Sequence, residues 1–139
     1  MNYLDASAVV ALLTPEAGSN RVEAWLQAAE DNPCVSPWVN SEISSALAIK
    51  VRTNALSLEA RALALSDWQR LRHASLAIEP IHAGHFDLAA SYCDRADLNL
   101  RAADALHIAV CATASHRLVT LDRAMADAAL LLGVPAVIP

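Results

Sequence analysis

Glycine, cysteine and lysine are all scarce in this sequence, and each scarcity excludes a class of site. The chain has 3 glycines, and its one lysine, Lys50, lies outside any GxxxxGK pattern, so it has no glycine-rich phosphate-binding loop. Its 3 cysteines form no CxxC pair, which argues against a disulfide framework and a structural zinc site. Charged residues make up 18% of the chain, too few for a coiled coil.

Long apolar runs are also missing, although the chain is apolar overall. No uncharged apolar stretch reaches the roughly 18 residues that a membrane-spanning helix needs. The segment Met1–Asp5 has no basic flank and includes an acid, so we expect no signal peptide. With 55% hydrophobic residues the sequence can build a core and is not disordered. We expect a cytoplasmic protein with no membrane contact and a single domain over residues 1–139.

The charge balance does not decide whether the protein binds nucleic acid. A formal net charge of −5 argues against an open basic platform. If four of the acids share one metal site, however, the rest of the chain is close to neutral. Four basic residues flank the motif helices and are candidates for phosphate contacts: Lys50, Arg52, Arg101 and Arg123.

Capping and turn residues predict short strands that alternate with helices. Strands are expected at residues 2–4, 33–35, 76–78, 118–120 and 137–138. Helices are expected at residues 7–13, 14–30, 36–53, 57–73, 82–96, 102–115 and 122–132. The second of these helices is expected to open with Thr14 as its N-cap, Pro15 at its first position and Glu16 as an early acid. The alternation implies parallel strands with right-handed crossovers. It predicts an α/β fold, a three-layer α/β/α sandwich around a short parallel β-sheet, with ligand sites at the carboxyl ends of the strands.

Four acids occupy positions at or just beyond expected strand ends or in early turns of helices. Asp5 follows the first strand directly, and Asp122 follows the strand at residues 118–120. Asp104 lies in the first turn of the most apolar helix, and Glu42 lies in the second turn of the helix that starts at residue 36. Each acid taken singly is an ordinary cap or an early helix acid, since helix N-termini favour negative charge.

Taken together, the four carboxylates predict a metal site. If they converge on one sheet edge they repel each other, and a cation relieves that repulsion. Oxygen-only ligands suit Mg²⁺ or Mn²⁺, which can activate water and stabilise a phosphorane. Ser7 and Thr120 carry hydroxyls that can orient the carboxylates or waters. His107 shares a helix face with Asp104, either as a hydrogen-bond donor behind the site or as a half-buried histidine with a structural partner.

Four segments occur in an order that resembles the PIN-domain nuclease family, specifically its VapC-type toxin branch. They are Leu4-Asp5-Ala6-Ser7, Ser41-Glu42, Arg101-Ala102-Ala103-Asp104-Ala105-Leu106-His107-Ile108-Ala109 and Val119-Thr120-Leu121-Asp122. The resemblance spans essentially the whole chain and implies a PIN-like α/β/α sandwich. It also implies that Asp5, Glu42, Asp104 and Asp122 are the acidic quartet of a metal-dependent endoribonuclease.

The resemblance further implies the reaction and the partners. Cleavage of an RNA phosphodiester would leave a 5′-phosphate and a 3′-hydroxyl, with Mg²⁺ or Mn²⁺ as cofactor and no catalytic histidine. A cognate antitoxin would hold the toxin inactive, and the chain would form a homodimer.

Two other functions remain open at this point. One is a Mg²⁺-dependent phosphoryl-transfer enzyme with a nucleophilic aspartate at a strand end. Asp5-Ala6-Ser7 resembles half of such a motif but has serine where a second aspartate is expected. The other is a PIN-like binding module without catalysis, although an unused acidic cluster destabilises a fold that lacks its cation.

Overall fold

The strands form one parallel sheet in the computed structural model, which describes residues 1–30 and 32–139. Its strands are β1 (Asn2–Leu4), β2 (Pro33–Val35), β3 (Ala77–Ile78), β4 (Arg117–Val119) and β5 (Ala136–Val137). They lie in the order β3-β2-β1-β4-β5, and each neighbouring pair is parallel. The expected mixed α/β fold with a short parallel sheet is therefore confirmed, and the first strand of the chain lies at its centre.

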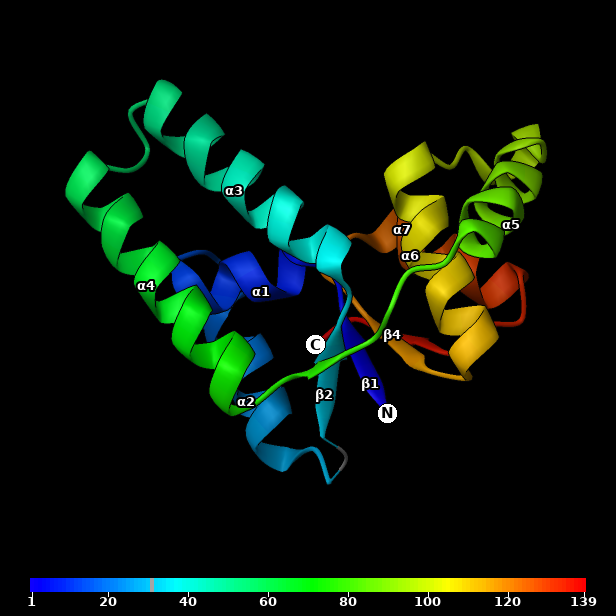
Figure 1. Ribbon diagram of the computed structural model, residues 1–139, viewed down its shortest axis with the longest axis horizontal. Helices are drawn as coiled ribbons and strands as arrows, with labels where there is room; N and C mark the ends of the chain where they lie inside the picture. Colours follow the sequence, from blue (N-terminus) through cyan, green and yellow to red (C-terminus); the bar gives the residue numbers. More distant parts are fainter. Residues whose placement is uncertain (31) are drawn as a thin grey trace.

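Helices cover both faces of this sheet (Figure 1). On one side lie α1 (Ala6–Leu13), α2 (Ser19–Ala28), α3 (Pro37–Arg52) and α4 (Leu58–Ala74). On the other side lie α5 (Ala83–Cys93), α6 (Ala102–Ala114) and α7 (Arg123–Leu131), with a short 3₁₀ helix at Ala96–Leu98 between α5 and α6. Helices and sheet together make the three layers.

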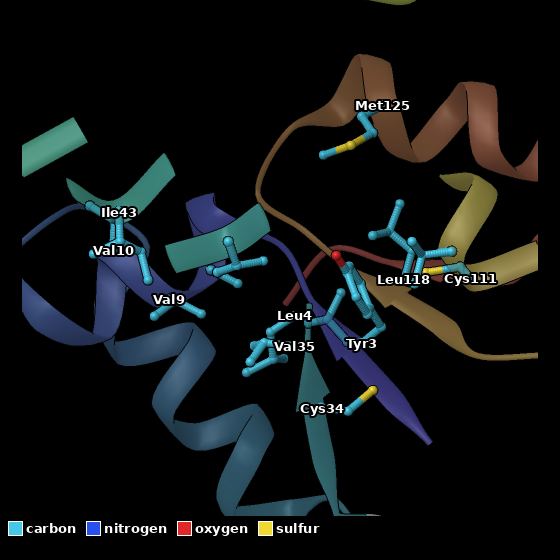
Figure 2. Close-up of a cluster of buried hydrophobic side chains, with 14 of the residues drawn as sticks. Tyr3, Leu4, Val9, Val10, Cys34, Val35, Ile43, Cys111, Leu118 and Met125 are labelled. Carbon is cyan, nitrogen blue, oxygen red and sulfur yellow. The ribbon is translucent and has the colours of Figure 1, made fainter. Parts of the chain in front are cut away.

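The core surrounds β1 and runs through both helical layers. Tyr3 and Leu4 are fully buried, and Figure 2 shows them among Val35, Leu118 and Cys111 from the neighbouring strands and α6. Both faces of a central parallel strand are covered, so its residues are buried irrespective of the face to which they point. Within the described residues, no helix has both the length and the apolar character needed to cross a membrane.

Strand register brings the ends of β1 and β4 to the same level. Leu4 pairs with Val119, and the N–H of Asp5 donates to the carbonyl of Val119 at 3.1 Å. The segments that follow these two strands therefore start next to each other and lead into α1 on one face of the sheet and α7 on the other. This edge is where parallel sheets place their ligand sites.

One expected helix start is wrong. Residues 14–16 do not open a helix, because Thr14 ends α1 and its hydroxyl donates to the carbonyl of Val10 at 3.1 Å. The hydroxyl of Ser19 donates to the Thr14 carbonyl and accepts from the N–H of Glu16, which shapes a turn before α2 begins at Ser19. Elsewhere the expected elements form with ends displaced by a few residues; α5, for example, ends at Cys93 instead of near residue 96.

Candidate active site

Asp5 is a buried carboxylate whose oxygens are both held by neighbours. It is 3% exposed. Its Oδ1 accepts from the Ser7 hydroxyl at 2.7 Å and from the N–H of Ala8 at 3.0 Å. Its Oδ2 accepts from the Ser7 hydroxyl at 2.9 Å and from the Thr120 hydroxyl at 2.8 Å. Burial raises the pKa of Asp5 above its ordinary value, and His107 together with these hydrogen bonds only partly offsets that rise.

Thr120 links this carboxylate to the loop that leads into α7. Its hydroxyl oxygen also accepts from the N–H of Asp122 at 2.9 Å. The N–H of Leu121 donates to the Ser7 hydroxyl at 2.9 Å. The ends of β1 and β4 are thus cross-linked through two hydroxyl side chains. The exposed Asp122 caps α7, because its Oδ1 accepts from the N–H of Met125 at 3.1 Å.

Asp104 is partly buried in the first turn of α6 and lies within electrostatic range of Asp122. Burial, and next the charge of Asp122, raise the pKa of Asp104 above its ordinary value. The backbone N–H and the charge of Arg101, together with His107, act in the opposite direction. Two carboxylates at the same end of the sheet therefore repel each other without full compensation.

Glu42 reaches the site from α3 and meets His107 of α6. The Oε2 atom of Glu42 lies 2.8 Å from Nε2 of His107, which is 2% exposed. The approach does not have hydrogen-bond geometry, so this buried oxygen has no hydrogen-bond donor. The other ring nitrogen of His107, Nδ1, lies 2.8 Å from the hydroxyl of Tyr3, whose oxygen is also 2.7 Å from Ser36 Oγ.

The structure brings these residues to one end of the sheet but does not arrange them as a complete coordination shell for a metal ion. Among the described residues, no three His, Cys, Asp or Glu side chains are grouped closely enough to surround one ion. Asp5 turns its oxygens toward hydroxyls, and Glu42 turns one oxygen toward His107. The donor set nevertheless fits a hard divalent cation, because it is oxygen-only, carries an uncompensated carboxylate pair and includes an orphaned buried oxygen on Glu42.

The sequence did not point to the buried side chains that contact His107 and so support the site. Tyr3 and Ser36 were not candidates, although a tyrosine within a fully buried strand needs a polar partner for its hydroxyl. His107 is fully buried and bonded to Tyr3, instead of half-buried. Of the four expected phosphate-binding residues, Arg52, Arg101 and Arg123 are exposed, whereas Lys50 forms an ion pair with Glu16.

Comparisons with known proteins bear on the family and the fold of the chain. The family model of the PIN domain matches residues 3–131. No curated protein matches the chain significantly.

Solved structures share the fold at low identity. Mycobacterium tuberculosis VapC20, described as a Sarcin-Ricin loop cleaving toxin, has a TM-score of 0.72 at 17% identity, covering 92% of this chain and 95% of that one. FitAcB from Neisseria gonorrhoeae has a TM-score of 0.68 at 20% identity, covering 98% and 96%. FitAB bound to an IR36 DNA fragment has a TM-score of 0.73 at 20% identity, covering 100% and 95%.

Proposed function

The chain belongs to the PIN-domain family, and on that basis we propose that it is a metal-dependent endoribonuclease, the toxin of a type II toxin–antitoxin pair. PIN domains are generally nucleases, which supports a hydrolase. The observation that carries the proposal is the pair of mutually repelling carboxylates, Asp104 and Asp122, in which Asp122 follows two residues after Thr120, the donor to the buried Asp5. We take residues 1–139 as one nuclease domain.

Asp5, Asp104 and Asp122 would hold Mg²⁺ or Mn²⁺, with Glu42 completing the set. A divalent cation bound there supplies a water that ionises near neutral pH and neutralises charge that builds on phosphorus. Ser7 and Thr120 hold Asp5 in one rotamer, so the carboxylate is set before substrate arrives. That fixed position is the contribution of the two hydroxyls.

Glu42 is the group suited to accept the proton of the attacking water. Its Oε2 lies 2.8 Å from Nε2 of His107, and this contact anchors the side chain on α6. The water oxygen bonds to phosphorus, and the bond from phosphorus to the 3′ oxygen breaks. The departing 3′ oxygen takes a proton from solvent water and becomes a 3′-hydroxyl, while the phosphate stays on the 5′ oxygen of the other fragment. The ribose 2′-hydroxyl takes no part, so no histidine is needed as a base.

RNA, a cognate antitoxin and a second copy of the chain are the partners we propose, all in the cytoplasm. RNA as the substrate class is supported by the description of VapC20 as a toxin that cleaves the Sarcin-Ricin loop. A protein inhibitor follows from the same proposal, because a free toxin of this kind must be held inactive in its host. The shared fold supports these assignments, and the experiment below tests the substrate.

The test is cleavage of a mixed pool of structured RNAs by purified protein in Mn²⁺ and in EDTA, beside Asp104→Asn. Cleavage that needs both the metal and Asp104 supports the proposal. Cleavage that persists in EDTA, or in the variant at full rate, contradicts it. Asp127→Asn on α7 is a matched control, because Asp127 is a helix acid outside the site.

A binding module without catalysis is the second candidate, and one observation favours it. The hydrogen bonds to Asp5 come from the protein itself, and no ready-made group of metal ligands is present in the described residues. If Mn²⁺ fails to raise the melting temperature, this candidate replaces the nuclease. A phosphoryl-transfer enzyme that uses Asp5 as nucleophile fits poorly, because Ser7 stands where such a motif has its second aspartate.

A further inference from the structure

Lys50 and Glu16 form an ion pair across a hollow that opens beside the candidate active site. The Nζ of Lys50 lies 2.5 Å from Oε1 of Glu16, and the two side chains are 25% and 31% exposed. Both residues line a hollow of about 530 Å³, whose walls also include Ser7 and Glu42. The ion pair and the acids of the site thus share one cavity.

One stripe of α3 forms a wall of this hollow. Glu42, Ser45, Ala46, Ile49 and Lys50 line it, a spacing of three, four, seven and eight residues that places side chains on one helix face. At about 1.5 Å of rise per residue, the backbone of Lys50 is ~12 Å along the helix from that of Glu42. A stacked strand advances about 3.4 Å per nucleotide, so this distance spans three to four nucleotides.

The opposite wall carries Glu16, and its backbone is held in place. The N–H of Glu16 donates to the hydroxyl of Ser19 at 2.9 Å. Two residues after Glu16, Gly18 packs against Leu121, where an added Cβ would lie 2.7 Å from Leu121 Cδ1. The loop that presents Glu16 is therefore in contact with the residue that precedes Asp122.

The charge arrangement is unusual for a site that must accept a polyanion. Lys50 is the chain's one lysine, and it is the basic residue that lines the hollow. Its charge is neutralised by Glu16, and Glu42 at the far end of the same hollow adds another negative charge. A partly exposed ion pair of this kind adds little stability, so a second anion can displace its carboxylate readily.

We propose that this hollow is a phosphate-binding subsite for the RNA strand, in which Lys50 contacts a backbone phosphate a few nucleotides from the cleaved bond. Without RNA, the carboxylate of Glu16 pairs with the ammonium group of Lys50. When RNA binds, a backbone phosphate takes the place of that carboxylate. The ion pair then sets the affinity for RNA without taking part in the cleavage step. This inference rests on the proposed function, since it assumes an RNA substrate.

Binding is tested apart from cleavage, in the Asp104→Asn background with Ca²⁺. The probe is a fluorescently labelled single-stranded RNA of random sequence, titrated at several salt concentrations. Lys50→Met should weaken binding about three- to tenfold and lower the slope of log K against log salt by about 0.7, the value for one phosphate contact to a single strand. Lys50→Arg should keep both. Glu16→Gln should tighten binding about threefold, because it removes the competing anion.

Two outcomes of the binding assay contradict the proposed subsite. One is that Lys50→Met binds with the affinity and salt slope of its parent. The other is that Glu16→Gln weakens RNA binding as Lys50→Met does, which would mean that the ion pair only stabilises the fold. Melting temperatures of both variants identify loss of fold, and Glu59→Gln at the start of α4 is a matched control outside the hollow.

Cleavage by the otherwise wild-type chain separates failure of the subsite from failure of the nuclease proposal. We expect Glu16→Gln to lower KM and Lys50→Met to raise it, with kcat retained in both. If the wild type cleaves RNA and neither variant changes KM, only the subsite is wrong. If the wild type neither binds nor cleaves RNA, both proposals are wrong.

Discussion

The hydroxyl of Thr120 donates a 2.8 Å hydrogen bond to the carboxylate of Asp5, although the two residues are 115 positions apart in the chain. The bond exists because β1 and β4 are neighbours in the sheet and end at the same level. It joins the bonds from Ser7 and Ala8 in fixing a carboxylate that is almost completely buried. The geometry of the site is therefore tied to the pairing of these two strands.

Removal of that hydroxyl should affect both stability and cleavage. Thr120→Val keeps the shape of the side chain but leaves Asp5 and the N–H of Asp122 each with one bond fewer. We expect the free energy of unfolding to fall by about 1–3 kcal/mol, the effect of an unsatisfied buried polar group. RNA cleavage should fall about tenfold, as the carboxylate loses its fixed position.

The matched control for this change is Thr113→Val. The hydroxyl of Thr113 donates to the carbonyl of Ala109 within α6, so the same substitution there removes a local threonine hydrogen bond outside the site. Denaturant unfolding and RNA cleavage are measured for both variants. Equal loss of cleavage in both would contradict the role given to Thr120.

Neutralising Asp104 should abolish cleavage and leave the fold intact. Asp104→Asn removes one of two carboxylates that repel each other, so the metal-free variant should have a higher melting temperature than the wild type. Cleavage should fall about 100-fold or more, in line with the loss of one charged group at a phosphoryl-transfer centre. Calorimetry in EDTA and a cleavage assay in Mn²⁺ measure the two effects. A variant that is both less stable and fully active contradicts the site.

Stability without metal should depend on pH through the same residue. Burial and the charge of Asp122 raise the pKa of Asp104 above 3.8, so the folded state binds this proton more tightly than the unfolded state does. The ionised carboxylate then destabilises the fold, and the penalty grows as pH rises from the unfolded pKa through the raised folded value. In EDTA, the melting-temperature gain of Asp104→Asn over wild type should be small near pH 4 and largest near pH 7. A gain that is constant with pH, or that reverses, contradicts this assignment.

Removal of the Tyr3 hydroxyl should slow cleavage, although Tyr3 itself does not touch the substrate. Tyr3→Phe deprives Nδ1 of His107 and the Ser36 hydroxyl of a buried partner, and His107 is the residue against which Glu42 rests. We expect kcat to fall about three- to tenfold with KM unchanged, because Glu42 loses a fixed neighbour. Tyr92→Phe on α5 is the control, since Tyr92 takes no part in these contacts. Equal kinetics for both variants would remove Tyr3 from the site.

Expression of the chain without its antitoxin should slow growth of the host. Asp5→Ala should abolish this effect, and Asp104→Asn should do so as well while it keeps the fold. Growth curves after induction, with protein levels compared by immunoblot, provide the measurement. Equal toxicity of wild type and both variants at equal expression would contradict the toxin assignment.

Much of this architecture could be predicted from local sequence patterns. Short apolar segments bounded by caps and turns predicted the strands and helices, because those signals act within a few residues. Asp5 and Asp122 come just after strands, and that position alone is enough to place them at the carboxyl edge of a parallel sheet. The start of α2 was wrong because a proline after threonine has the same local pattern in a turn as in a cap, and here contacts from Ser19 decided for the turn.

The sequence by itself thus determined the alternation of elements, the family resemblance and the acids available to a site. Only the tertiary structure decided which of those acids have hydrogen-bond or ion-pair partners, and which residues are the partners. The bonds from Thr120 to Asp5, from Tyr3 to His107 and from Lys50 to Glu16 join residues that strand pairing and helix packing bring together, and no local pattern encodes them. Burial then raises the pKa values of Asp5 and Asp104, because removal from water disfavours their charged forms.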